Sequence, residues 1–472
     1  MHHQDQEEEC YNIFMDDEDF SSFSSRYYDP YNHHQQQQQT SNTTMPTTST
    51  GGATPSENHA YGRLTDKLSY SYSAARDLSL EFAASLSGQN GKWASDILLE
   101  TAKAVAHRNT GRVQQLMWML NELSSPYGDV DQKLAFYFLH ALFCRMTDSG
   151  KRTYRTMISA LEKNCSFEST RKVVLKFQEV SPWTTFGHVF CNGAIINTFE
   201  GESKFHIIDI SNTFSTQWPT LLEAIATRTQ ETPHLRLTTI VATKSGGAGV
   251  QRVMKEIRSR MEKFARIMGV PFEFNVVHLA GDLSELNLAE LEVKEDEALA
   301  VNCVGKLHSV TTGDNHRDFL MSMFRMLHPR IVTVVEEEAD LDVDVDEDDF
   351  PRSFQEILRF FRVYFEALDE SFPRTSNERL RLEQAAGTAV MDLIACPPTE
   401  SVERRDTAAR WSHRLQRGDF RPVSFNDEIC ADVRASLKRY REGWSIVPCS
   451  DSPGIFLSWK DQPVVWASAW KP

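Results

Sequence analysis

The hydrophobic positions of this chain follow a helical period first and a strand–helix alternation later. Apolar residues recur at the i, i+3, i+4, i+7 spacing in residues 116–123, and the same spacing continues in 134–142 after a Ser-Ser-Pro break. This pattern predicts an all-helical block that ends near Phe199. Its leucine stripes fit either a dimer seam or an ordinary core.

After Gly201 the pattern changes, and short runs rich in β-branched residues alternate with amphipathic helices. The predicted strands are 205–211, 235–243, 272–279, 298–304 and 330–336. The predicted helices between them are 218–229, 250–268 and 316–328. Strands that alternate with helices form a parallel sheet covered on both faces. Right-handed crossovers then give a doubly wound, Rossmann-like α/β core.

The last 120 residues of the chain are predicted to complete this core. Two or three more helices follow, in 354–370, 376–396 and 403–416, and a capping box from Thr375 to Glu378 is expected to open the second. The end of the chain is rich in tryptophan and carries two turn signals, 452–454 and 461–463. This pattern predicts a strand pair that finishes the sheet in the antiparallel sense.

The first 90 residues are polar and low in complexity, with a glutamine run from Gln35 to Gln39. Such a composition does not offset chain entropy by burial, so we expect disorder. The predicted division is therefore a tail (1–90), a helical cap (91–200) and a Rossmann-like core (201–472). Within the tail, residues 7–20 embed apolar and aromatic side chains in acid, which fits an acidic activation or docking segment as well as a solvated tail.

Charge and cysteine usage narrow the class of protein. The formal net charge is −16, which argues against a general basic surface for nucleic acid but leaves room for a local basic face. The 8 cysteines form no CxxC pair, as is typical of reduced thiols in a cytosolic or nuclear protein. The amino terminus does not resemble a secretory signal, and no apolar run is long enough to predict a membrane span.

The first strand–helix loop, 209–217, is where a Rossmann-like sheet ordinarily binds its ligand. A nucleotide or S-adenosylmethionine needs glycines there so that the backbone can approach, and this loop has Ser211, Thr213 and Ser215 in those positions. The second strand ends in Ala-Thr-Lys, without the acid that would hold a ribose. We therefore predict neither enzymatic activity nor a cofactor, and we expect Phe214 to plug the site.

Polar residues near this loop are predicted to be structural. His206 and Asp209 are three apart on a strand, so they point to opposite faces and do not share a metal. His206 is interpreted as a core histidine, and Asp209 as a cap for backbone N–H groups of the loop. Trp218-Pro219 is expected to open the next helix, because proline is tolerated in a first turn.

Charged runs elsewhere offer few candidate sites. The acidic stretch 336–349 fits a solvated loop or a docking face for a basic partner, and Glu336, Glu337 and Glu338 are the better docking candidates. The short basic patches 171–172, 404–405 and 438–441 are interpreted as solvated helix faces.

Several of these segments resemble the motifs of the plant GRAS regulators. Residues 205–209 (FHIID) resemble the VHIID motif, and Gln217-Trp218-Pro219-x-Leu221 its usual continuation. Residues 372–396 and 402–405 resemble the PFYRE region and the segment after it, and the Trp-Ala-Ser-Ala-Trp ending resembles the SAW region. The match runs from about Trp93 to Pro472. Residues 120–129 and 177–183, the serine-rich first loop and 335–340 resemble the SHORT-ROOT subgroup. Phe205 replaces the leading valine, and Thr388-Ala389 stand where many members have Arg-Glu.

This resemblance implies a helical cap on a Rossmann-like core without enzymatic activity. It implies a transcriptional co-regulator that forms a heterodimer with a SCARECROW-type GRAS protein and reaches DNA through C2H2 zinc-finger proteins of the BIRD group. It also implies a role in root radial patterning, asymmetric cell division and endodermis specification, with movement between cells and a place in nucleus and cytoplasm. The motif residues with an expected structural or partner-binding role are His206, Asp209, Gln217, Trp218, Pro219, Arg404, Trp444, Trp459 and Trp470.

Overall fold

The computed structural model describes residues 92–472 apart from 212, 229–231, 243–247, 311–314, 342–348 and 451. These residues include nearly all of the predicted helical cap and Rossmann-like core. The predicted tail with its acidic island at 7–20 lies outside the described residues, and so does the acidic run at 342–348.

The described part of the chain begins with six consecutive helices. They are α3 (Trp93–Ala106), α4 (Thr110–Leu123), α5 (Val130–Met146), α6 (Gly150–Asn164), α7 (Phe167–Val180) and α8 (Pro182–Thr198). Local polar residues set their starts: Asp129 and Gln132 form a capping box on α5, and the Ser181 hydroxyl accepts from Trp183 N at the start of α8. The predicted helical block therefore forms, with its end close to Phe199.

The second half of the chain builds one mixed sheet. Its parallel strands are β1 (Lys204–Ser211), β2 (His234–Ala242), β3 (Phe272–Leu279), β4 (Ala298–Val304) and β5 (Ile331–Glu337). The strand order β3-β2-β1-β4-β5-β9-β8-β7 has the reversal at β1/β4 that defines a doubly wound fold. Helices α9 (Trp218–Arg228), α10 (Ala248–Met268) and α11 (His316–Met326) connect the parallel strands. The predicted fold class is confirmed.

The tryptophan-rich end forms three strands rather than a pair, namely β7 (Trp444–Pro448), β8 (Ile455–Trp459) and β9 (Gln462–Lys471). β9 pairs antiparallel with β5 on one side and with β8 on the other, and the short β6 (Arg421–Pro422) also pairs with it. The last residues of the chain thus lie inside the sheet, as the predicted antiparallel completion requires.

Alternate residues of the strands face two different helical layers. Val334 belongs to an apolar cluster that includes Met321 of α11 and Trp411 of α14 (Ala408–Arg417). The neighbouring Val335 points to the other face, where a Cβ on Gly187 of α8 would lie 2.7 Å from its Cγ1. Helix α8 therefore packs directly on the sheet, although the predicted division assigned it to the cap.

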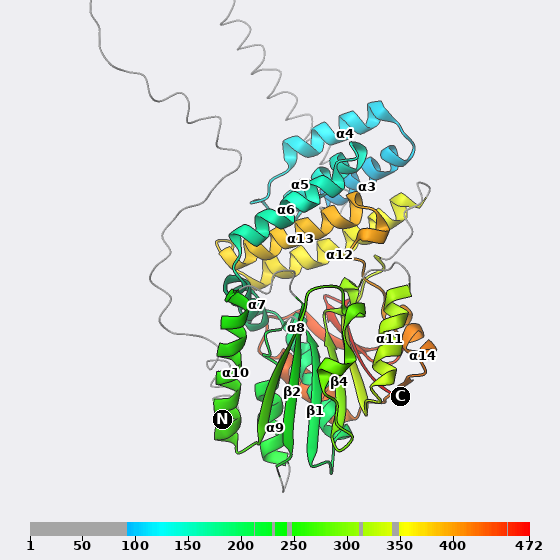
Figure 1. Cartoon of the computed structure of the whole chain (residues 1–472). Helices are drawn as coiled ribbons and strands as arrows, with labels where there is room; N and C mark the ends of the chain where they lie inside the picture. Colours follow the sequence, from blue (N-terminus) through cyan, green and yellow to red (C-terminus); the bar gives the residue numbers. More distant parts are fainter. Residues whose placement is uncertain are drawn as a thin grey trace, which may run out of the picture. The chain divides into compact units, whose positions relative to one another are not determined.

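The helical layer above the sheet is assembled from two distant parts of the chain (Figure 1). Helix α12 (Phe350–Ser371) lies against α3 and α5 and also touches β9, and helix α13 (Asn377–Ala395) lies against α5 and α6. The Tyr137 and Phe365 rings stack with centroids 5.7 Å apart, and the buried Lys133 Nζ lies 2.6 Å from Glu383 Oε1. Helix α13 begins with Ser376 as its cap, so the predicted capping box at Thr375 is wrong by one residue. The last helix is α15 (Asp427–Leu437).

Candidate functional site

The carboxyl ends of β1 and β4 are where a doubly wound sheet ordinarily holds its ligand, and here polar side chains fill that position. Asp209 is fully buried, and its Oδ2 accepts a hydrogen bond of 3.0 Å from the indole Nε1 of Trp218. Its Oδ1 accepts from Asn302 Nδ2 at 3.4 Å. Asp209 therefore serves side chains, and the predicted capping of loop N–H groups is wrong.

A polar network continues from Asn302 of β4 to β5, to α8 and to the loop before α9. Asn302 Nδ2 donates to Gln217 Oε1 at 3.1 Å, and Thr333 Oγ1 of β5 donates to Asn302 Oδ1 at 2.8 Å. Gln217 Nε2 donates in turn to Asn192 Oδ1 of α8 at 3.0 Å. Each of these side chains is buried, and each polar group has a partner within the chain. The network occupies the switch point of the sheet with the protein's own atoms.

Burial also changes the acid–base chemistry of this position. The pKa of Asp209 is raised because burial penalises its charged form, and the hydrogen bonds from Trp218 and Asn302 offset only part of this effect. The arrangement is typical of a structural network that orients β1, β4 and α9.

The loop after β1 packs against α7. Phe214 and Ser215 both adopt the left-handed conformation, with φ of 56° and 61°. The Phe214 ring lies against Phe167 of α7, with centroids 5.0 Å apart. Side chains therefore stand where glycines would let a nucleotide approach. Pro219 follows Trp218 in the first turn of α9 and is buried, as expected for the start of that helix.

His206 lies closer to the amino end of β1, in a separate cluster. Its pKa is lowered to about 3 by burial and by the neighbouring Arg236 guanidinium, so the ring is neutral. Arg236 Nη2 donates to His206 Nδ1 at 3.0 Å, which leaves Nε2 to donate to Thr238 Oγ1 at 2.9 Å. Arg236 also pairs with the buried Glu297. His206 is a satisfied core histidine.

The three candidate docking carboxylates are already engaged within the chain. Glu336 is buried, and its Oε1 accepts from the backbone of Lys306 and Leu307 at 2.9 and 2.6 Å. Glu337 pairs with Arg405, and Glu338 Oε2 accepts from Ala408 N at the start of α14 at 2.6 Å. In this structure they do not form an exposed acidic face, because each carboxylate accepts hydrogen bonds from, or pairs with, another part of the same chain.

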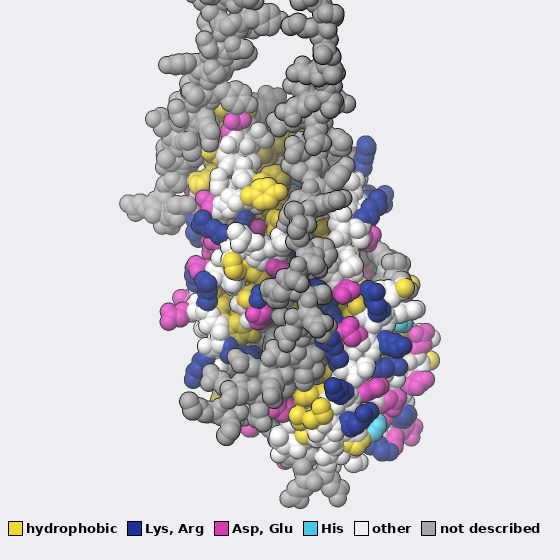
Figure 2. All heavy atoms as spheres, turned by 90° about the vertical axis from the view of Figure 1, so that its left-hand side faces the viewer, with side chains coloured by type: hydrophobic (Ala, Val, Ile, Leu, Met, Phe, Trp, Pro, Cys, Tyr) yellow, Lys and Arg dark blue, Asp and Glu magenta, His cyan; other side chains and the backbone are white. Residues whose placement is uncertain are grey.

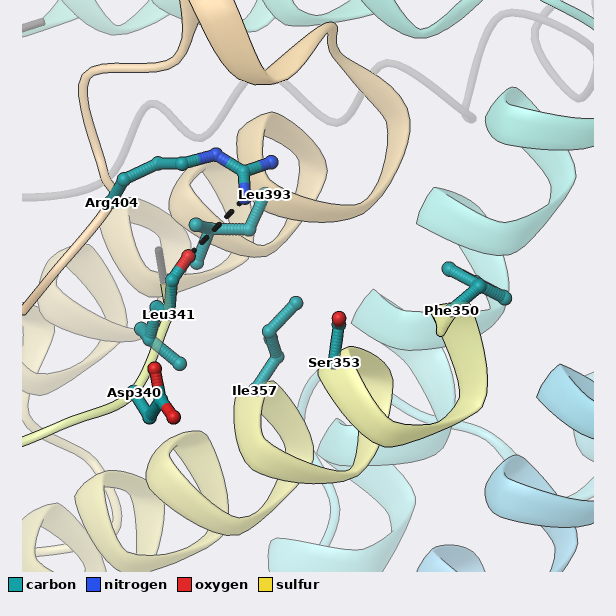
Figure 3. A pocket seen from close by; sticks show the side chains of 7 residues that line it. All are labelled: Asp340, Leu341, Phe350, Ser353, Ile357, Leu393 and Arg404. Atoms are coloured by element: carbon teal, nitrogen blue, oxygen red, sulfur yellow. Dashed lines mark hydrogen bonds between the residues drawn. The ribbon is translucent and has the colours of Figure 1, made fainter. Parts of the chain in front are cut away.

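The basic pairs also point inward more than the pattern suggested. Arg171, Arg404 and Arg405 are all buried, so their interpretation as solvated helix faces is wrong. Arg404 Nη1 donates to Leu341 O at 3.3 Å beside a small cavity with room for about one water molecule (Figure 3). Arg171 pairs at 3.0 Å with Glu256, whose side chain is more exposed, and Arg405 pairs with Glu337 and Glu403.

The tryptophans at the end of the chain have two different surroundings. Trp470 is fully buried within β9, and its Nε1 donates to Ser468 Oγ at 2.9 Å. Trp459 is buried on β8, and the half-buried Trp444 lies 4.7 Å from it between ring centroids. Trp444 also meets the Trp183 ring of α8 at 6.1 Å, edge to face. These rings tie the last strands to the helical layer.

Sequence reasoning missed several residues of these clusters, among them Asn192, Asn302 and Arg236. A polar residue in the middle of an otherwise apolar strand, as Asn302 is, was the available signal.

The described residues contain no group of three or more His, Cys, Asp or Glu that could hold a metal ion. No described helix is long and apolar enough to cross a membrane. On the side seen in Figure 2, the described Lys and Arg side chains are interspersed with Asp and Glu.

Comparison with known proteins agrees with this architecture. Protein SHORT-ROOT of Arabidopsis thaliana is 60% identical over 403 residues, which cover 84% of this chain and 75% of that protein. Protein SHORT-ROOT 1 of Oryza sativa subsp. japonica is 54% identical over 413 residues, 81% of this chain and 69% of that protein. The crystal structure of SCL7 from Oryza sativa superimposes with a TM-score of 0.66 and 25% identity, covering 80% of this chain and 99% of that one. Residues 94–471 match the GRAS domain family, and the chain belongs to it.

Proposed function

We propose that this chain is a non-enzymatic transcriptional co-regulator of plant development. The observation that carries the proposal is the polar network around Asp209, Gln217 and Asn302, which fills the position where a Rossmann-like enzyme holds its cofactor. The similarity to SHORT-ROOT proteins over most of the chain supports a regulatory role.

The finer role extends what the family resemblance implies. We propose that the protein forms a heterodimer with a SCARECROW-type GRAS protein and reaches DNA through C2H2 zinc-finger proteins of the BIRD type. Its role would then be root radial patterning, asymmetric cell division and endodermis specification. It would act in the nucleus, pass through the cytoplasm and move between cells. The name of the SHORT-ROOT relatives supports the developmental part of this proposal.

The motif residues fit this proposal as parts of the scaffold. His206, Asp209 and Gln217 hold inner hydrogen bonds, and Trp459 and Trp470 are buried in the sheet. We propose that they act on partner binding only through the fold. The half-buried Trp444 is the motif position best placed both to pack in the fold and to contact a partner.

A gel shift with the purified full chain tests the proposal. A promoter fragment is mixed with a BIRD-type zinc-finger protein, with this chain, or with both. We expect this chain alone to leave the DNA unshifted and to add a slower band only when the finger protein is present. A sequence-specific shift by this chain alone would make it a direct DNA-binding factor instead.

The non-enzymatic part of the proposal has its own test. A ligand that binds only the folded state raises its stability in proportion to the logarithm of its concentration. We expect S-adenosylmethionine to leave the melting temperature unchanged up to millimolar concentration. A saturable rise would indicate a methyltransferase-type site and contradict the assignment of the loop after β1.

A further inference from the structure

One helix of the cap presents a row of cationic side chains to the outside. An open groove follows α6, and its lining includes Lys151, Arg152, Arg155 and Lys163. Gly150 is the one buried residue of this helix, so its outer face has no packing partner among the described residues. The 3.6-residue period places Arg152, Arg155 and Lys163 in one stripe, which spans about 16 Å along the helix axis.

Most cationic side chains of this groove have no carboxylate as an ion-pair partner. Lys151 Nζ lies 2.6 Å from Glu400, and each side chain is nearly half exposed, so solvent weakens this pair. Within the described part of the chain, the side chains of Arg152, Arg155 and Lys163 have no hydrogen bond or ion pair. The stripe is therefore a local excess of positive charge.

This excess stands out against the rest of the molecule. The chain carries a formal net charge of −16, and surface arginines on α14 and α10 have carboxylates close by. Arg410 pairs with Asp340, Arg414 with Asp318, and Arg252 with Glu168, at 2.6, 3.0 and 2.9 Å. A positive stripe on an acidic protein attracts anionic groups at short range only, because the whole molecule repels large polyanions at long range.

We propose that the groove along α6 docks an acidic peptide segment of a partner protein. Guanidinium and ammonium groups form strong, charge-assisted hydrogen bonds with carboxylates. Small residues line the groove between the cations, among them Ser159 and Ala160, so a peptide backbone can approach the helix. About five extended residues match the length of the stripe. Duplex DNA fits less well, since its binding draws on roughly six to ten phosphate contacts.

The inference goes beyond the proposed function, which names no surface, and it does not depend on that function. Fluorescence anisotropy with the full chain tests it, at about 50 mM salt, where exposed charges are weakly screened. The probe is a labelled synthetic peptide of about 12 residues with aspartate or glutamate at alternate positions and serine between them. We expect saturable binding that weakens steeply as salt rises.

Two charge-reversal variants separate the stripe from net charge. Arg152→Glu with Arg155→Glu should weaken the peptide about tenfold or more, whereas Lys255→Glu with Lys263→Glu on α10 should change it by less than about twofold. Both variants alter the net charge equally, and Lys255 and Lys263 are exposed residues of a different helix. The conservative pair Arg152→Lys with Arg155→Lys should retain most of the binding.

Three outcomes would overturn the proposal: no binding, an equal loss in both variants, or tighter α6-dependent binding of a duplex of about 20 base pairs. The last would assign the stripe to nucleic acid. Circular dichroism checks that each variant folds. If the α6 variant does not fold, hydrogen exchange of the unaltered chain shows whether the peptide binds along α6. Protection of residues 150–164 by the peptide supports the site, and protection confined to other segments refutes it.

Discussion

The ion pair between Glu337 and Arg405 ties the end of β5 to the segment before α14, and its removal should destabilise the fold. Both side chains are mostly buried, and Trp183 Nε1 donates to Glu337 Oε1 at 2.8 Å. Glu403 Oε2 lies 3.0 Å from the same guanidinium and is more exposed. The perturbation is Glu337→Gln, which keeps the shape and one acceptor but removes the charge.

The expected loss follows from these contacts. Leaving one partner of a buried pair without its counter-charge costs about 3–5 kcal/mol. Glutamine keeps an acceptor for Trp183, and Glu403 still neutralises part of Arg405, so we expect a loss of about 2–3 kcal/mol. Glu403→Gln is the matched control. It removes the more exposed carboxylate and should cost about 1 kcal/mol or less.

The pH dependence gives an independent check. Burial alone would raise the pKa of Glu337, but the Arg405 guanidinium outweighs burial and lowers it below its ordinary value of 4.5. The ionised carboxylate therefore contributes stability that is present above pH 4.5 and is lost as pH falls through the lowered pKa. The difference between Glu337→Gln and the unaltered chain should shrink in acid.

Urea unfolding at neutral pH measures the loss as a shift of the midpoint at constant slope. A change below about 0.5 kcal/mol, within the range of ordinary surface substitutions, would refute the structural role. If the same variant lost partner binding at unchanged stability, Glu337 would be a docking carboxylate instead.

Three further predictions concern single side chains. Burial raises the pKa of Glu338 to about 7, so the stability that its protonated form contributes should be lost as pH rises from 4.5 to about 7. In Glu338→Gln the melting temperature should therefore depend less on pH across this range than in the unaltered chain. A Cβ on Gly387 would lie 2.2 Å from Tyr137 Cδ1, so Gly387→Ala should lower the unfolding free energy by about 1–3 kcal/mol, whereas Gly111→Ala, with open space around it, should raise it by up to about 1 kcal/mol. Trp470→Ala should cost about 3–5 kcal/mol in denaturant unfolding because the ring is fully buried, and the exposed Lys471→Ala should cost less than about 0.5 kcal/mol; equal effects would contradict the placement of β9 inside the sheet.

Local patterns were enough to predict the five parallel strands and most helices, whereas the end of the chain forms three strands and not the predicted pair. The strand patterns predicted β3 and β4 with their observed bounds. β4 is buried along its whole length and is a nearly continuous apolar run, whereas β3 is an edge strand that is only partly buried. The prediction that the loop after β1 does not hold a nucleotide also needed only its own residues, since the absence of glycine is a local property. Periodicity and loop composition act over a few residues and need no knowledge of distant partners.

Local patterns did not predict which distant segment packs against each apolar or charged face. The pairing of Lys133 with Glu383 joins residues 250 apart in the chain and places α13 in the cap, which no local pattern indicates. The carboxylate of Glu337 looked like a candidate for an external partner until Arg405, 68 residues away, was placed beside it.

The sequence by itself determined the elements of this protein, its doubly wound order, its family and its lack of a glycine-rich ligand loop. Only the tertiary structure decided that α8 lies on the sheet, that α12 and α13 complete the cap, and that an amide network fills the switch point. The physical reason is that backbone propensity and hydrophobic period are short-range. The choice among equally apolar faces and the matching of buried charges depend on which distant segments pack together.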